Sequence, residues 1–144
     1  MIEAFPLPDL DADSAPFWQA AARGELAIQE CSRCSRLRFP PRPMCPHCRS
    51  LESAWRPVSG RGTVWSFVVA HPPLLPAFAA LAPYNVLLVA LDEEPTVRLS
   101  GNLIAAEGAA INSVDPATIR IGEPVRVVFD HVAEGVALPR WVRA

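Results

Sequence analysis

The sequence predicts a mainly β protein in which a short N-terminal helix and a cysteine-rich metal-binding ribbon precede a small closed barrel. All four cysteines fall within residues 31–48, as two Cys-x2-Cys pairs. Residues 58–144 contain several short runs rich in β-branched and aromatic residues, separated by Gly, Pro, Asp or Glu. The 16 prolines among 144 residues favour short elements over long helices.

The N-terminal part predicts a loose arm, one helix and a brief strand. Residues 1–13 are acidic and carry prolines, which indicates an arm. Ser14 suits a helix N-cap and Pro16 suits the first turn, while Gly24 ends the apolar run. Residues 26–29 then read as a strand that leads into the first cysteine pair. The apolar residues at helical spacing between cap and stop are Phe17, Trp18, Ala21 and Ala22.

The remainder of the chain predicts strands joined by polar turns. A strand at 55–58 and a turn at 59–62 come first, and further strands are expected at 63–70, 84–91, 96–99 and 125–129. The 84–91 segment is apolar on both faces, so it should lie in the interior of a sheet. About five such strands favour an OB-fold, with an SH3-like barrel as the alternative. We place the domain boundary after residue 57, giving a helix-and-ribbon domain at 1–57 and a barrel domain at 58–144.

The cysteine pattern predicts one structural zinc ion. Cys31 and Cys34 are separated by ten residues from Cys45 and Cys48. Two Cys-x2-Cys turns can supply the four tetrahedral ligands that zinc requires, with Zn–S near ~2.3 Å. Four thiolates leave no position for water, so the ion would stabilise the fold and take no part in catalysis. His47, inside the second pair, should face solvent.

Three other uses of these cysteines stay open. Iron binds to the same four-thiolate set. Two disulfides would require an oxidising compartment, for which the sequence carries no signal. A redox pair would sit at the start of a helix in a thioredoxin-like unit, which this pattern does not indicate.

Charge and hydropathy restrict the class of protein. All 13 basic residues are Arg, and the formal net charge is −2. A protein that holds a phosphate backbone usually has a basic excess, so we expect no nucleic-acid partner. Single-stranded nucleic-acid binding stays the alternative, since Trp65 and Phe67 offer stacking surfaces on a strand. The N-terminus lacks the pattern of a secretory signal and no run is long enough to span a membrane, so we expect a cytoplasmic protein without membrane contact.

Residues suited to acid–base chemistry do not assemble into a catalytic set in the sequence. We find no nucleophile, base and orienting group at interpretable spacing, so we expect the chain not to be an enzyme by itself. The 72–83 segment is too apolar for a free loop, and should either cover the barrel mouth or contact a partner. The acid–base candidates are His71, Asp92, Glu93, Glu94, Asp130 and His131.

From about residue 14 to residue 141, the order of short motifs resembles the DUF35 family. These motifs include Pro16-Phe17-Trp18, both cysteine pairs, Phe39-Pro40-Pro41-Arg42, Gly60-Arg61-Gly62-Thr63-Val64, Pro83-Tyr84, Gly101-Asn102-Leu103 and Ile121-Gly122-Glu123-Pro124-Val125. The resemblance implies a helical segment and a rubredoxin-like zinc ribbon, followed by an OB-fold. One departure is clear. Where the family often has Gly after the first pair, this chain has Ser35, and the turn then needs a φ that serine can adopt.

The resemblance also implies a function in acyl-CoA metabolism. Family members accompany thiolase-superfamily enzymes, namely thiolases, acyltransferases or steroid side-chain aldolases. They are inferred to bind acyl-CoA or to hold the partner in working shape. We therefore expect a non-catalytic scaffold subunit of a hetero-oligomer in lipid, steroid or polyketide metabolism. Phe17, Trp18 and Trp141 would add apolar surface for that partner.

Two arginines are the candidates for binding the phosphates of coenzyme A. Arg61 lies in the Gly60–Gly62 turn and Arg98 lies on a predicted strand. The guanidinium fork matches phosphate geometry, and the two glycines would let the backbone approach a phosphate closely.

Overall fold

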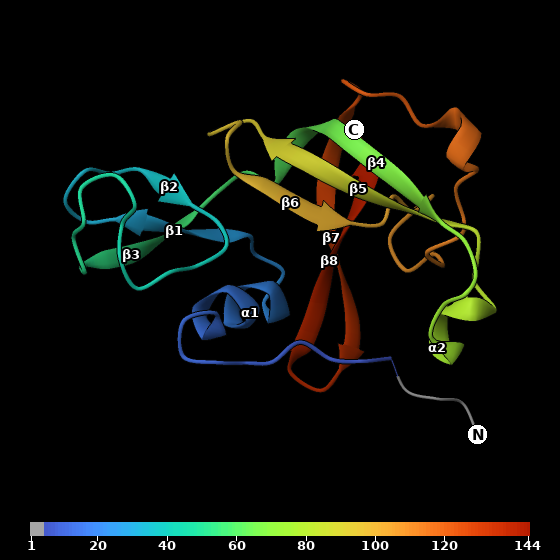
Figure 1. Cartoon of the computed structure of the whole chain (residues 1–144), viewed down its shortest axis with the longest axis horizontal. Coiled ribbons are helices and arrows are strands. Elements are labelled where there is room, and N and C mark those ends of the chain that lie inside the picture. Colours follow the sequence, from blue (N-terminus) through green and yellow to red (C-terminus); the bar gives the residue numbers. More distant parts are fainter. Residues whose placement is uncertain (1–4) are drawn as a thin grey trace.

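The computed structural model describes residues 5–144 as two antiparallel sheets with a helix beside them (Figure 1). The smaller sheet has the order β2-β1-β3, formed by β1 (Ala27–Cys31), β2 (Leu37–Arg38) and β3 (Ser53–Pro57). The larger sheet has the order β6-β5-β4-β7-β8. Its strands are β4 (Arg61–Ala70), β5 (Tyr84–Leu91), β6 (Arg98–Gly101), β7 (Pro124–Ala133) and β8 (Val136–Arg143).

The larger sheet curls into a nearly closed barrel. Its two ends meet where Leu103, just after β6, forms a parallel bridge with Trp141 of β8. The Ile104 N–H donates to the Trp141 carbonyl at 2.8 Å, and the Trp141 N–H donates to the Asn102 carbonyl at 2.9 Å. Because β5 pairs with both β4 and β6, the predicted interior position of the 84–91 strand is confirmed.

The predicted helix is present as α1 (Ala15–Ala22), and Ser14 occupies its N-cap position as predicted, although without a side-chain cap. The Ser14 hydroxyl makes no capping bond, and donates instead to the Asp9 carbonyl at 3.3 Å. The Ser14 N–H donates to Asp11 Oδ1 at 2.8 Å, so the preceding turn holds the serine. Gly24, with a φ of 78°, ends the helix as expected.

Four elements were not predicted. They are the two-residue strand β2, the short helix α2 (Pro76–Ala79), the 3-10 helix η1 (Pro116–Thr118) and the final strand β8. In β8, Pro139 interrupts the pattern, and proline inside a run normally argues against a strand. The pairing with β7 nevertheless continues across it, with Pro139 opposite Phe129. Neither α1 nor α2 has the length and apolar character to cross a membrane, and residues 5–144 contain no other helix that does.

One hydrophobic cluster joins the helix, the ribbon and the barrel. Phe17 of α1 and Ile28 of β1 belong to the same buried cluster as Val64, Leu87 and Trp141 of the barrel. The expectation that Phe17 and Trp141 provide surface for a partner is wrong, because they are 4% and 0% exposed. Burying these large rings removes apolar area from water and stabilises the packing between both parts of the chain. The domain boundary after residue 57 stays a prediction.

The N-terminal arm lies against the barrel over its described residues. Residues 1–4 of the predicted loose arm lie outside the described residues. The Phe5 ring packs against Phe78 of α2, with 4.9 Å between ring centroids. From there the arm crosses in front of the β7–β8 hairpin, in the view of Figure 1, to reach α1.

Candidate functional site

Backbone hydrogen bonds shape both cysteine turns in the same way. The Cys31 N–H donates to the Arg36 carbonyl at 3.0 Å, and the Ser35 N–H donates to the Cys31 carbonyl at 2.9 Å. In addition, the Cys34 N–H points at Cys31 Sγ, 3.5 Å away. The second turn repeats the two backbone bonds at the same spacing, from Cys45 to Ser50 and from Arg49 to Cys45, both at 2.9 Å.

The two turns bring the four sulfurs to one centre. The Cys31–Cys48 sulfurs are 3.4 Å apart and the Cys34–Cys45 sulfurs 3.7 Å apart, and all four lie within 4.8 Å of one another. A tetrahedral ion with Zn–S near 2.3 Å places its sulfurs about 3.8 Å apart. The sulfurs therefore fit a tetrahedral S4 metal centre. They are too far apart for disulfides, whose S–S length is ~2.05 Å.

The electrostatics of the cluster also favour a cation. The backbone N–H of Cys34 lowers the pKa of the Cys31 thiol to about 6. The backbone N–H of Cys48 similarly lowers the pKa of Cys45. Although the N–H of Arg36 acts in the same direction on Cys34, burial and the neighbouring sulfurs raise the pKa of Cys34 to about 11. Four adjacent thiols cannot all ionise without a positive charge between them, and a divalent metal ion would supply it.

Residues around the metal centre are exposed. His47 is exposed as predicted, and its Nδ1 lies 2.7 Å from an Arg36 guanidinium nitrogen. The residue after each cysteine pair has a left-handed backbone, with φ of 59° at Ser35 and 63° at Arg49. Serine and arginine therefore adopt the conformation for which glycine is favoured.

Replacing Ser35 with glycine should stabilise the ribbon slightly. Glycine relieves the steric cost of positive φ, and we expect a gain of roughly 0.5–1 kcal/mol in the free energy of unfolding of the metal-loaded protein. Urea unfolding with Ser32→Gly as the matched control measures this gain, since Ser32 is also exposed but has no positive φ. A Ser35→Gly variant less stable than the parent would contradict the expectation.

The two candidate phosphate-binding arginines lie on the same face of the barrel sheet. Arg98 is opposite Ala90, which is opposite Thr63, two residues after Arg61. The Arg98 guanidinium carbon stacks 3.8 Å above the centre of the Trp65 ring, and its buried Nε has no partner. Arg61 is exposed. Neither arginine lines the four cavities of about 640, 470, 350 and 180 Å³ described among residues 5–144. Their role in binding coenzyme A stays a prediction.

The two glycines beside Arg61 serve packing within the chain. A Cβ atom on Gly60, whose φ is 76°, would collide with the Val127 side chain. One on Gly62 would collide with the Ala90 carbonyl oxygen. The space beside these two glycines, which was predicted to admit a phosphate, is therefore filled by residues of β7 and β5.

The acid–base candidates occupy separate places. His71 is exposed just after β4, as a strand-end residue should be. The 92–94 acids form the turn between β5 and β6, where Glu93 Oε1 accepts the Ser59 N–H at 2.6 Å. Asp130 on β7 forms an ion pair with Arg140 at 3.2 Å. Next to it in the chain, His131 is exposed.

The apolar 72–83 segment partly covers the barrel and partly faces outward. Phe78 packs against both Phe5 and Tyr84, at centroid distances of 4.9 and 6.0 Å. Leu75, immediately before α2, is 62% exposed. The segment thus covers part of the barrel and also leaves apolar surface exposed, and contact of that surface with a partner stays a prediction.

Sequence reasoning missed a buried polar network at the barrel closure. Asn85 is 0% exposed, and its side chain binds both the N–H and the carbonyl of Leu103, at 2.7 and 2.9 Å. Asn102 donates to the Asn85 carbonyl at 2.6 Å and accepts from Arg140. Asparagine within an otherwise apolar strand, in the 84–91 segment, was the available signal.

Comparison with known proteins places these features in a family. Residues 18–53 match the model of the ChsH2 rubredoxin-like zinc ribbon domain, and residues 55–130 match that of the ChsH2 C-terminal OB-fold domain. The barrel is thus an OB-fold and the SH3-like alternative is excluded. The shape also matches a solved chain, described as "Ltp2-ChsH2(DUF35) aldolase", with a TM-score of 0.80 and 37% identity over 94% of this chain and 98% of that one.

Two curated relatives extend the comparison. A "Probable enoyl-CoA hydratase alpha subunit" of Thermomonospora curvata is 41% identical over 93% of this chain, which spans only 38% of that relative's length. A "DUF35 domain-containing scaffold protein" of Methanothermobacter thermautotrophicus is 34% identical over 78% of this chain and 77% of the relative. With the four-cysteine ribbon, the OB barrel and a relative matched over most of both chains, this protein belongs to the DUF35 family.

Proposed function

We propose that this chain is a non-catalytic auxiliary subunit that binds a thiolase-superfamily enzyme acting on an acyl-CoA. The proposal rests mainly on the structural match, over 94% of this chain, to a DUF35 chain described as part of an aldolase. The name of the scaffold relative supports the auxiliary role, and the name of the hydratase relative supports a link to CoA chemistry. The pathway would be one of lipid, steroid or polyketide metabolism.

The structure supplies the physical means for such a role. The S4 centre has no open coordination position, so the ion would serve as a rigid bracket for the ribbon. The ribbon and barrel share one core, which gives a partner a rigid surface to bind. Arg61 and Arg98, on one sheet face, would meet the phosphates of coenzyme A.

Co-expression with the cognate thiolase-superfamily enzyme should give a complex that survives gel filtration. A stable complex buries at least ~1,000 Å² in total, and a central apolar residue contributes ~2 kcal/mol or more. We expect Leu75→Asp to weaken the complex at least ~30-fold, because it places a charge on the exposed apolar surface beside α2.

The matched control is Ile121→Asp, a similarly exposed aliphatic residue in the loop before β7. It should leave the complex intact, and both variants should retain their metal. If the enzyme is soluble and active alone and never co-elutes with the unmodified chain, the auxiliary role is wrong. The alternative of single-stranded nucleic-acid binding would then be tested by salt-dependent anisotropy with a labelled oligonucleotide.

A further inference from the structure

An apolar cavity of about 640 Å³ lies where the helix, the ribbon and the barrel meet. Trp18 of α1, Phe39 of the ribbon, and Tyr84 and Val86 of β5 contribute to its walls. Its volume falls within the ~300–1,000 Å³ typical of small-molecule sites. The cavity is thus built from three separate parts of the fold.

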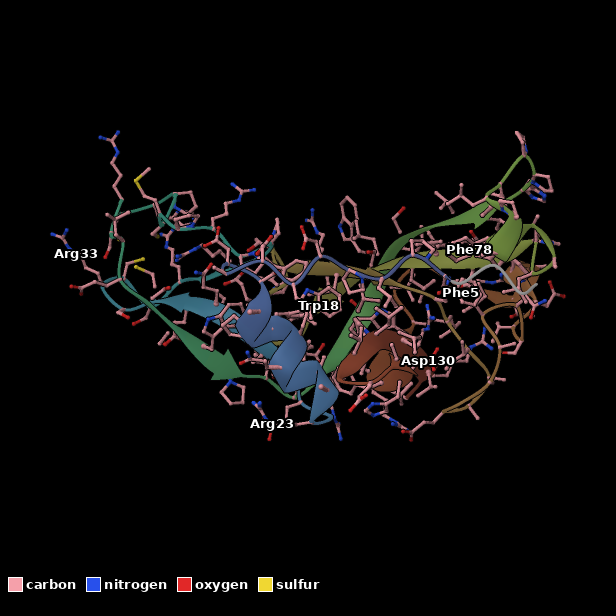
Figure 2. The ribbon with its side chains drawn as sticks, turned by 90° about the horizontal axis from the view of Figure 1, so that it is seen from below. Phe5, Trp18, Arg23, Arg33, Phe78 and Asp130 are labelled. Carbon is pink, nitrogen blue, oxygen red and sulfur yellow. The ribbon has the colours of Figure 1, made fainter. Side chains whose placement is uncertain are left out.

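The N-terminal arm forms one wall of this cavity and continues over a second one. Pro8 and Asp9 of the arm line the first cavity. Phe5 lines an adjoining cavity of about 350 Å³, which shares Phe78, Leu138 and Arg140 with the first. Figure 2 shows the arm crossing the molecule between Trp18 and the Phe5–Phe78 contact. The apolar space therefore extends along the arm on both sides of Arg140.

Arg140 is the cationic group in this apolar lining. Its side chain is only 15% exposed, and its Nε and Nη2 donate to Asp130 at 3.3 and 3.2 Å while Nη1 donates to Asn102. These bonds use three of the five N–H groups of a guanidinium, so two remain for a ligand. Ser100, at the same edge, adds a hydroxyl.

The charges around Arg140 determine which hydrogen-bond acceptor of a ligand the cavity favours. Asp130 neutralises Arg140, and Asp9 adds a carboxylate at the cavity rim. An entering carboxylate would meet this acidic surplus and would lose its hydration shell. A neutral carbonyl oxygen can accept hydrogen bonds from the free Arg140 N–H groups without repulsion by these carboxylates and without the desolvation of a charge.

We propose that this cavity binds a neutral aliphatic or alicyclic acyl group, whose carbonyl oxygen accepts a hydrogen bond from Arg140. The inference deepens the proposed function, on which it rests for the identity of the ligand as an acyl thioester. The apolar walls hold the carbon skeleton and the arm covers it. The nucleotide part of a coenzyme A ester lies outside this cavity.

The test uses the purified metal-loaded chain without a partner. The probe is octanoyl-N-acetylcysteamine, a neutral thioester that lacks a nucleotide, with sodium octanoate and free coenzyme A as comparison ligands. Two-dimensional 1H–15N NMR should show saturable shifts at the Trp18 indole N–H, Ser100 and Asn102. Octanoate should bind at least tenfold more weakly than the thioester, and coenzyme A should cause no shifts at these three positions.

Variants separate this cavity from nonspecific apolar binding. Val86→Phe fills the cavity and should weaken thioester binding at least tenfold, and Ser100→Phe at the rim serves the same purpose if the buried replacement fails to fold. Arg140→Met keeps the apolar stem but removes the N–H donors, and should weaken binding roughly tenfold. The matched control Ile121→Phe should bind as the unmodified chain does, since Ile121 is 68% exposed and outside the cavity lining.

Several results would overturn the inference. They are no saturable thioester binding, shifts confined to other residues, tighter binding of octanoate, or unchanged binding by folded cavity-filling variants. Thioester binding by a chain that forms no complex with the enzyme would refute the proposed partner alone. An intact complex without thioester binding by this chain would refute the cavity assignment alone.

Discussion

Replacing Cys45 with serine is expected to release the metal and to lower the unfolding temperature of the whole chain in a single transition. The parent protein should contain about one zinc ion per chain. Structural zinc contributes roughly 10–16 kcal/mol of apparent binding free energy to small zinc domains. Loss of one ligand should remove at least ~5 kcal/mol of stability, or on the order of 15 °C in Tm.

The reason for a single transition is the shared core. Leu26, Ile28 and Leu37 of the ribbon half pack in the same cluster as the barrel residues Val64 and Trp141. Because this buried cluster is continuous across both parts, we do not expect the barrel to stay folded after the ribbon loses its metal.

The matched control for this variant is Met44→Ser. Met44 adjoins Cys45 but is 50% exposed, so its replacement should change neither the metal content nor the Tm appreciably. Elemental analysis and thermal unfolding by circular dichroism measure both quantities. Iron in place of zinc would correct the identity of the ion, and an unchanged Tm in metal-free Cys45→Ser would refute the structural role.

Replacing Asn85 with alanine should strongly destabilise the barrel, although Asn85 lies outside the metal centre. Its side chain is the hydrogen-bond partner of both the N–H and the carbonyl of Leu103 within the buried barrel closure. Each buried backbone group left without a partner costs ~1–3 kcal/mol. We expect a loss of about 3 kcal/mol in the free energy of unfolding, and about 10 °C in Tm.

Asn112→Ala provides the control, because Asn112 is exposed in the loop between β6 and β7. Its replacement should change stability by less than ~0.5 kcal/mol. Amide hydrogen exchange supplies a second measurement, since loss of the Asn85 bonds should increase exchange at Leu103 and Ile104 before it does so in β4. Equal stability of the two variants would show that the network contributes nothing to barrel closure.

Local sequence patterns correctly predicted those structural features that depend on residues close together in the chain. The Cys-x2-Cys spacing positions two thiols on one turn, so the spacing alone predicts the four metal ligands that the structure brings together. Alternation and β-branched residues located β4, β5 and β7, and Gly24 marked the end of α1. Ser35, which stands where the family often has Gly, adopts a positive φ within its turn, and Arg49 does the same in the second turn.

The sequence by itself determined the metal ligands, the ribbon–barrel order and most strands, because each depends on residues close together in the chain. Only the tertiary structure decided which large side chains are covered. Tryptophan is a residue type common at interfaces, yet Trp141 is buried because the barrel closes through its bridge with Leu103. Asn85 acquires its role from Leu103, 18 residues away, and Arg140 meets Asn102 across 38 residues. Such pairings depend on strand register and barrel closure, which local periodicity does not specify.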